Sequence, residues 1–123
     1  MTDRERMEAG LLYDPGEESI MAEQMPCQEL LWKYNHMGPS EYDERQKLLK
    51  DIFCECGENN FLQGPVNANW GGRHVHLGSG IYANFNLTIV DDGECRIGNY
   101  VMFAPNVTIS TTGHPIHPSF RDK

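Results

Sequence analysis

The chain has 123 residues, a formal net charge of −8 and a sequence pI near 5.0. This length suits one domain with a hydrophobic core, and the acidic balance argues against binding to nucleic acid or to an anionic membrane. No apolar run approaches the roughly 20 residues that a membrane-crossing helix needs, and the charged start Met1-Thr2-Asp3-Arg4-Glu5 does not resemble a signal peptide. We therefore expect a cytoplasmic protein.

The first residues predict a short helix followed by a turn. Thr2 and Glu5 have the spacing of a capping box, and Gly10 is placed to end the helix that they begin. Asp14-Pro15-Gly16 is a turn by composition.

Two longer helical segments follow. From about Glu18 to Asn35 apolar residues recur at helical spacing, and Pro26 begins, kinks or divides that helix, so two short helices are as plausible as one long helix. Ser40 is expected to cap the next helix, which we expect to end near Gly57. One face of that helix predicts a core-facing apolar stripe. The stripe consists of Leu48, Leu49, Ile52, Phe53 and Cys56.

Extended structure is expected from Phe61 onward, and from Val75 apolar residues recur every six positions. The series are Leu77, Ala83 and Ile89; Val75, Ile81 and Leu87; Ile97, Phe103 and Ile109; and Cys95, Val101 and Val107. A period of six is typical of a parallel β-helix, in which each short strand forms one side of a coil. An ordinary β-sandwich is the alternative, but its period of two would not by itself produce this rhythm. We expect a helical region over residues 1–60 and the start of a β-helix over residues 61–123.

His114 is the candidate catalytic base. A histidine side chain titrates near neutral pH and can accept a hydroxyl proton. Gly113 and Pro115 flank it and predict a loop that holds the imidazole in a defined direction. The alternative is a loop histidine that is simply exposed to water.

Tyr82, Asn84 and Asp92 are candidate ligands for a partner rich in hydroxyl groups. A phenol, an amide and a carboxylate supply the mixed donors and acceptors with which proteins bind sugars, together with an aromatic face for the ring. The structural alternatives are a coil-corner hydrogen bond for Asn84 and a solvated loop for Asp91 and Asp92.

The cysteines and histidines do not predict a metal centre. The four cysteines lack a C-x-x-C pair, and we expect free thiols in preference to structural zinc. They are Cys27, Cys54, Cys56 and Cys95. His74 and His76 would share one face of a strand, but no further ligands are evident nearby, so we expect no metal.

Several segments together resemble one family, the galactoside and maltose O-acetyltransferases among the hexapeptide-repeat acyltransferases. In the second half these segments are Tyr82-Ala83-Asn84-Phe85-Asn86-Leu87-Thr88-Ile89-Val90-Asp91-Asp92, Ala104-Pro105-Asn106-Val107-Thr108 and Thr112-Gly113-His114-Pro115. In the first half they are Ala9-Gly10, Leu12-Tyr13, Tyr34-Asn35 and Gly57-Glu58-Asn59. The resemblance therefore covers nearly the whole chain.

The resemblance implies a mainly β fold, a left-handed parallel β-helix behind a helical N-terminal region on the acceptor side. It also implies a homotrimer with active sites between subunits, and acetyl transfer from acetyl-CoA to a sugar hydroxyl of a galactoside, maltose or glucose. His114 matches the family's catalytic base. The positions that match acceptor-binding residues are Asn84, Tyr82 and Asp92, with Asn69 and Asp14 as further candidates.

Members of this family continue for several more coils, which build most of the acetyl-CoA site, so we expect a truncated β-helix or a piece of a longer protein. The alternative function is that of a catalytically silent protein that retains only the sugar pocket or the trimerising fold. Another acceptor for the same transfer, such as an amino sugar or a lipo-oligosaccharide, is a second possibility. A metal-dependent β-helix hydratase is a third.

Overall fold

A computed structural model describes residues 1–111 of the chain. Within these residues, helices come first and short strands follow. The helices are α1 (Asp3–Glu8), α2 (Glu18–Asn35), the 3-10 helix η1 (Pro39–Glu41) and α3 (Tyr42–Ile52). The strands are β1 (Glu55–Cys56), β2 (Phe61–Leu62), β3 (Val66–Ala68), β4 (Val75–Leu77), β5 (Tyr82–Ala83), β6 (Leu87–Val90), β7 (Cys95–Ile97), β8 (Met102–Phe103) and β9 (Thr108–Ser110).

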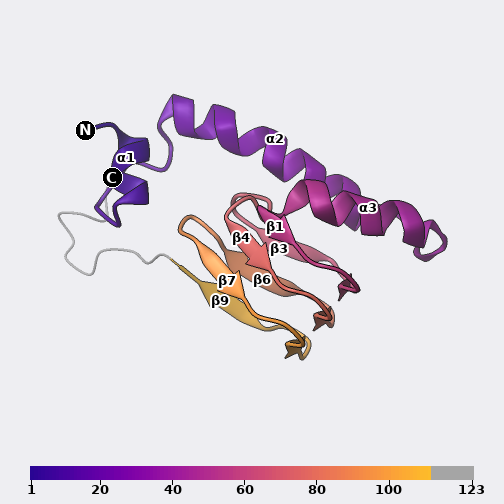
Figure 1. The fold of residues 1–123 in the computed structure, drawn as a ribbon. Coiled ribbons are helices and arrows are strands. Elements are labelled where there is room, and N and C mark those ends of the chain that lie inside the picture. The colour runs from indigo at the N-terminus through magenta and orange to yellow at the C-terminus, as the bar shows by residue number, and fades with distance from the viewer. Residues whose placement is uncertain (112–123) are drawn as a thin grey trace.

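The strands form three parallel sheets, in the orders β1-β4-β7, β2-β5-β8 and β3-β6-β9. Each set of three consecutive strands makes one coil, and each strand pairs with the equivalent strand one coil later. The predicted β-helix with a helical N-terminal region is therefore confirmed. Figure 1 shows α2 and α3 lying across the first coil, with the later coils stacked away from them.

The period of six is confirmed by burial as well as by register. The residues of the first two series all lie inside the coils, and Val75 and Ala83 are wholly buried. Leu77 pairs with Ile97, and Ala83 pairs with Phe103 one coil later. Stacking of like positions in successive coils thus produces one continuous apolar column.

The helices close the end of this column. A single core joins the coil interior to buried residues of α2, α3 and the turn after α3. The contributions from the helical side are Leu31, Tyr34, Leu48, Leu49, Ile52 and Phe53. Leu48, Leu49 and Ile52 of the expected stripe are therefore core on α3, because they cover the first coil and shield its interior from water. Phe53 follows the helix, and Cys56 lies on β1.

The chain passes Pro26 within one uninterrupted helix, α2, which was one of the two alternatives left open above. Three other details differ from the sequence expectations. The Ser40 side chain does not cap α3. Instead the 3-10 helix η1 precedes α3, and the Gly38 N–H donates a hydrogen bond to Glu41 Oε2 at 2.8 Å. Helix α3 ends at Ile52, well before Gly57, and strand pairing already begins at Glu55. The coils thus start earlier than Phe61, because parallel pairing of β1 with β4 outweighs the weak local signal of two residues.

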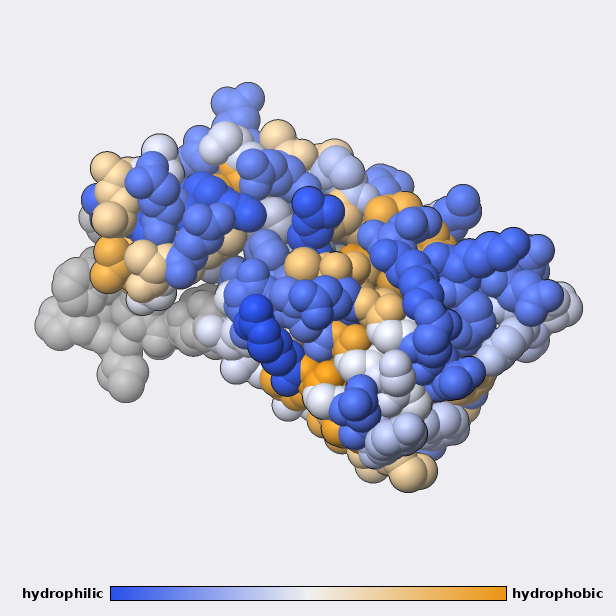
Figure 2. All heavy atoms as spheres, viewed as in Figure 1, coloured by the Kyte–Doolittle hydropathy of each residue, from blue (hydrophilic) through white to orange (hydrophobic). Residues whose placement is uncertain are grey.

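None of the helices within residues 1–111 is long and apolar enough to cross a membrane. Figure 2 shows apolar side chains open to the surface on the coils, bordered by hydrophilic ones. The large exposed apolar residues of the coils are Tyr82, Phe85, Tyr100 and Met102.

Candidate functional site

The corner between the third sheet and the first is the irregular part of each coil. A coil of three hexads would repeat every 18 residues or so, yet Glu55 pairs with His76 and Val75 pairs with Cys95, which are 21 and 20 positions apart. The extra residues lie in the loop after β3 (residues 69–74) and in the loop after β6 (residues 91–94). Two of the candidate residues, Asn69 and Asp92, lie in these loops.

Asp91 holds the two loops together. Its carboxylate accepts hydrogen bonds from the Trp70 N–H at 2.7 Å and from the Gly72 N–H at 3.0 Å, while its backbone carbonyl accepts from His74 Nδ1 at 2.7 Å. The residue is wholly buried, so the solvated loop named above as its structural alternative does not describe it. Burial raises the pKa of the Asp91 carboxyl, and the hydrogen bonds from the backbone oppose that rise.

The neighbouring Gly71 allows the loop after β3 to pack closely against α2. Its φ is +63°, and a Cβ at this position would lie 2.1 Å from the Cys27 carbonyl oxygen. A side chain is therefore disfavoured by the backbone conformation and excluded by the contact with the helix. This close contact and the Asp91 hydrogen bonds together fix where Asn69 begins the loop.

Asp92 is half-buried, and its carboxylate accepts hydrogen bonds from two distant segments. Asn69 Nδ2 donates to Oδ1 at 3.0 Å, and the Tyr13 hydroxyl donates to Oδ2. The structure thus brings together two of the predicted residues, Asn69 and Asp92. It adds Tyr13, which sequence reasoning did not identify as a site residue.

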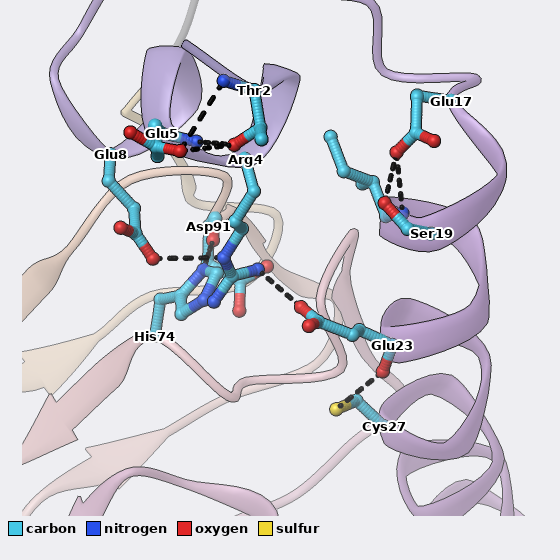
Figure 3. Close-up of polar contacts among 11 residues, drawn as sticks. Thr2, Arg4, Glu5, Glu8, Glu17, Ser19, Glu23, Cys27, His74 and Asp91 are labelled. Carbon is cyan, nitrogen blue, oxygen red and sulfur yellow. Dashed lines mark hydrogen bonds and ion pairs between the residues drawn. The ribbon is translucent and has the colours of Figure 1, made fainter.

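Tyr13 reaches this corner because the N-terminal segment is anchored there. Its ring packs against a second apolar cluster, which consists of Met7, Ile20 and Trp70. The Arg4 guanidinium lies 4.9 Å from the centre of a Trp70 ring and pairs with Glu8 at 2.9 Å and with Glu23 at 3.0 Å. Figure 3 shows Arg4 reaching from α1 to Glu23 on α2.

Asp14 occupies the turn after Tyr13 but uses its carboxylate locally. Its Oδ1 accepts from the Gly16 N–H at 3.0 Å, and its own N–H donates to Asp3 Oδ1 at 3.1 Å. The side chain is exposed, and it makes none of the contacts that hold Asp92. Tyr13, the adjacent residue, makes the link to Asp92.

Tyr82 lies on β5, and Asn84 lies in the corner between β5 and β6. Tyr82 is 37% exposed and stacks on Phe61, with ring centres 5.7 Å apart. Asn84 is half-buried, and its Oδ1 accepts from the Phe85 N–H at 2.8 Å, a corner hydrogen bond of the kind named above as the structural alternative. Strand β6 lies between Asn84 and Asp92 in the sequence and has four residues, which span about 13 Å at roughly 3.3 Å per residue. Within one subunit, this strand therefore separates Asn84 from Asp92.

His114 lies outside the described residues. The described part of the chain ends at Thr111, whose hydroxyl donates to the Val90 carbonyl at 2.7 Å and accepts from the Gly93 N–H at 2.8 Å. Thr111 therefore lies against the same corner as Asp92.

The remaining candidates for metal binding have other roles. His76 lies between Glu94 at 2.8 Å and Glu55 at 3.3 Å on the outer face of the first sheet. Within residues 1–111 no three histidine, cysteine or acidic side chains are grouped so as to hold a metal ion. All four cysteines are free thiols, as expected.

A groove of about 350 Å³ runs between α2 and the β3–β6 face, and Asn69 lies in its wall. Its walls carry several amide and hydroxyl side chains beside one indole. These are Gln28, Trp32, Asn35, Asn67, Asn69 and Thr88. The groove is open to solvent, and Asn69, which donates to Asp92, is one of the residues that line it.

Comparison with known proteins shows that the chain is similar to sugar acetyltransferases. Residues 6–57 match the maltose acetyltransferase hexapeptide capping motif. The chain is 48% identical over 112 residues to a galactoside O-acetyltransferase of Lactococcus lactis subsp. lactis (strain IL1403), which covers 91% of this chain and 54% of that protein. It is 43% identical over 117 residues to a galactoside O-acetyltransferase of Escherichia coli (strain K12), which covers 95% of this chain and 57% of that protein.

Solved structures of similar proteins share this fold. A galactoside acetyltransferase in complex with coenzyme A superposes with a TM-score of 0.94 at 42% identity, over 99% of this chain and 60% of that one. A maltose O-acetyltransferase from Clostridium difficile 630 superposes with a TM-score of 0.90 at 31% identity, over 99% of this chain and 65% of that one. The chain thus spans little more than half the length of the curated relatives described here.

Proposed function

We propose that this chain, which belongs to the galactoside and maltose O-acetyltransferases, acts in the transfer of an acetyl group from acetyl-CoA to a sugar hydroxyl. The observation that carries the proposal is the corner at Asp92, where two donors from distant segments hold one accessible carboxylate. A fixed carboxylate beside an amide is suited to accept hydrogen bonds from sugar hydroxyl groups. We also propose that the protein is cytoplasmic.

In the proposed reaction His114 is the general base. It accepts the proton of the sugar hydroxyl as the hydroxyl oxygen attacks the thioester carbon of acetyl-CoA. A C–O bond forms, the C–S bond breaks, and the proton passes from His114 to the departing thiolate to give free CoA. Such a base typically contributes about 10²- to 10⁴-fold, and holding both substrates in place supplies the larger share.

The residues of this chain would divide the work of binding the acceptor. Asp92 and Asn69 form one half-site, which we call the Asp92 half-site, and Tyr82 with Asn84 forms another, the Tyr82 half-site. Because β6 separates them, we propose that the two meet across the boundary between subunits of a homotrimer. Asp14 would approach the acceptor from the turn beside Tyr13.

The acceptor is a galactoside, maltose or glucose in this proposal, and the experiment must separate them. Purified protein is mixed with acetyl-CoA and each acceptor in turn, and release of the free CoA thiol is followed. Release that depends on the acceptor, with an acetylated sugar as product, is expected. A His114→Ala variant that folds normally but releases CoA at the wild-type rate would refute the role of His114.

A catalytically silent sugar-binding or trimerising protein is the competing candidate. It predicts binding of a galactoside or glucoside without any acceptor-dependent consumption of acetyl-CoA. The same assay therefore decides between the two, provided that binding of the sugar is measured on the same preparation.

A further inference from the structure

We propose that Tyr13 is a positioning residue for the sugar acceptor and that it acts by orienting the carboxylate of Asp92. This inference rests on the proposed function, because it assigns Tyr13 to the Asp92 half-site. It gives the N-terminal region, in which residues 6–57 match the capping motif, a direct part in the site. The region would then do more than cover the end of the coils.

The geometry at Asp92 carries the argument. A carboxylate offers about four lone-pair positions. One position on each oxygen is occupied, Oδ1 by Asn69 Nδ2 at 3.0 Å and Oδ2 by the Tyr13 hydroxyl. A carboxylate held at both oxygens cannot rotate freely, so its remaining lone pairs keep a constant direction. Because Asp92 is only half-buried, those lone pairs are available to hydroxyl groups of a ligand.

The two donors are themselves fixed to one hub, Trp70. Asn69 precedes Trp70 in the chain, and the Trp70 N–H is held by the buried Asp91 carboxylate at 2.7 Å. The Tyr13 ring packs against the cluster that contains the Trp70 side chain, and Trp70 is 2% exposed. Both donors therefore approach Asp92 from a rigid base, which is the condition for a preorganised site.

The Asn69 backbone is fixed as well. Its carbonyl accepts from Gln28 Nε2 at 2.8 Å and from Gln24 Nε2 at 2.7 Å, both on α2. Helix α2 thus holds one donor, while the segment between α1 and α2 supplies the other. The N-terminal region contributes to both sides of the Asp92 carboxylate, so the corner loop alone does not complete the half-site.

The test removes only the hydroxyl, with Tyr13→Phe in the full chain. The phenyl ring keeps its packing, so we expect the thermal midpoint to change little. We expect the acceptor kcat/KM to fall about tenfold, the size expected when a hydrogen bond to a charged group is lost. Most of the fall should appear as a higher KM for the sugar, while the KM for acetyl-CoA should not change.

Tyr34→Phe is the matched control. The Tyr34 hydroxyl also donates a hydrogen bond, to the Leu62 carbonyl, but Tyr34 lies on the buried face of α2 and has no contact with the Asp92 half-site. This variant loses the same atom and should lower the thermal midpoint without changing the KM for the sugar. The pair of variants therefore separates a loss of fold stability from a loss of acceptor positioning.

Deoxy sugars give a second readout that a purely structural role would not alter. In the wild type, removing the acceptor hydroxyl that contacts Asp92 should reduce kcat/KM markedly. In Tyr13→Phe the same deoxy sugar should cause a smaller reduction, because the carboxylate is already poorly oriented. Equal reductions in the two proteins would overturn the proposal.

The outcomes are separable from failure of the proposed function. If the wild type shows no acceptor-dependent CoA release, the proposed function fails first. If the wild type is active and Tyr13→Phe has an unchanged or lower KM for the sugar, the positioning role is refuted. A lower KM would mean that the Tyr13 hydroxyl competes with the acceptor for Asp92.

Discussion

Replacing Asp91 by asparagine changes one atom at the most constrained point of the corner. The wild-type carboxylate accepts from the Trp70 and Gly72 N–H groups at 2.7 and 3.0 Å. An amide keeps one acceptor and turns an NH2 group toward the other N–H. That buried N–H then lacks a partner, which costs about 1–3 kcal/mol.

Part of this cost is offset. Burial raises the pKa of the Asp91 carboxyl, which means that its ionised form is less favourable in the folded protein than in the unfolded chain. Asparagine is neutral and avoids that penalty. We therefore expect Asp91→Asn to lower the free energy of unfolding by about 1–2 kcal/mol at neutral pH. Asp91→Ala, which leaves both N–H groups unpaired and opens a void, should cost about 3–5 kcal/mol.

The assay is urea unfolding of both variants and of Asp51→Asn, which replaces an exposed aspartate on α3 and should stay within about 0.5 kcal/mol of the wild type.

The pH dependence of stability gives a further check. As pH rises, the unfolded chain loses the Asp91 proton before the folded protein does. The contribution of Asp91 to stability is therefore present at acid pH and is lost as pH rises through its raised folded pKa. The difference in stability between wild type and Asp91→Asn should shrink accordingly. This reasoning would be refuted if Asp91→Ala were as stable as the wild type. It would also be refuted if the difference in stability between the wild type and Asp91→Asn grew as pH rises.

Three further predictions concern single side chains. Gly71→Ala should destabilise the fold by more than about 2 kcal/mol in urea unfolding, because its Cβ would lie 2.1 Å from a backbone oxygen of Cys27 at a positive φ. Gly98→Ala, where a Cβ meets nothing within 4 Å, is its control and should change stability by less than about 1 kcal/mol. Asn60→Ala should cost about 2–4 kcal/mol by the same measurement, because a buried amide that accepts one backbone hydrogen bond and donates another is removed; an unchanged urea midpoint would contradict this. His114→Ala should reduce turnover at least about a hundredfold in the CoA-release assay at an unchanged thermal midpoint.

The coils could be predicted from the sequence because their determinants are local and periodic. A buried residue every six positions follows from the geometry of a coil, and Val75, Ala83 and Leu87 lie inside as their positions predict. The two-residue strand β1 could not be predicted in this way, because its only support is pairing with β4. Whether α2 continues past Pro26 could not be decided from the sequence either, because the local pattern allows both one helix and two.

The site was only half predictable for the same reason. Asn69 and Asp92 could be named from their segments, but the link from Tyr13 to Asp92 joins residues 79 positions apart. No local pattern carries such a contact. The burial of Asp91 could not be predicted either. Two successive aspartates in a loop are normally exposed to solvent, and only the fold brings the loop that contains Trp70 against Asp91. His114 stays a prediction.

The most direct measurement is CoA release by oligomers that contain two different inactive subunits. Asn84→Ala and Asp92→Ala chains are co-expressed with different tags, and mixed oligomers are purified through both tags. Each variant alone should be strongly impaired. If the two half-sites meet between subunits, each mixed trimer should contain one site with both halves intact, so the purified mixed oligomers should recover up to about a third of the wild-type sites. No recovery in mixed oligomers, alongside an active wild type, would place both half-sites within one subunit and contradict the shared site. No acceptor-dependent CoA release by the wild type would contradict sugar acetyl transfer itself.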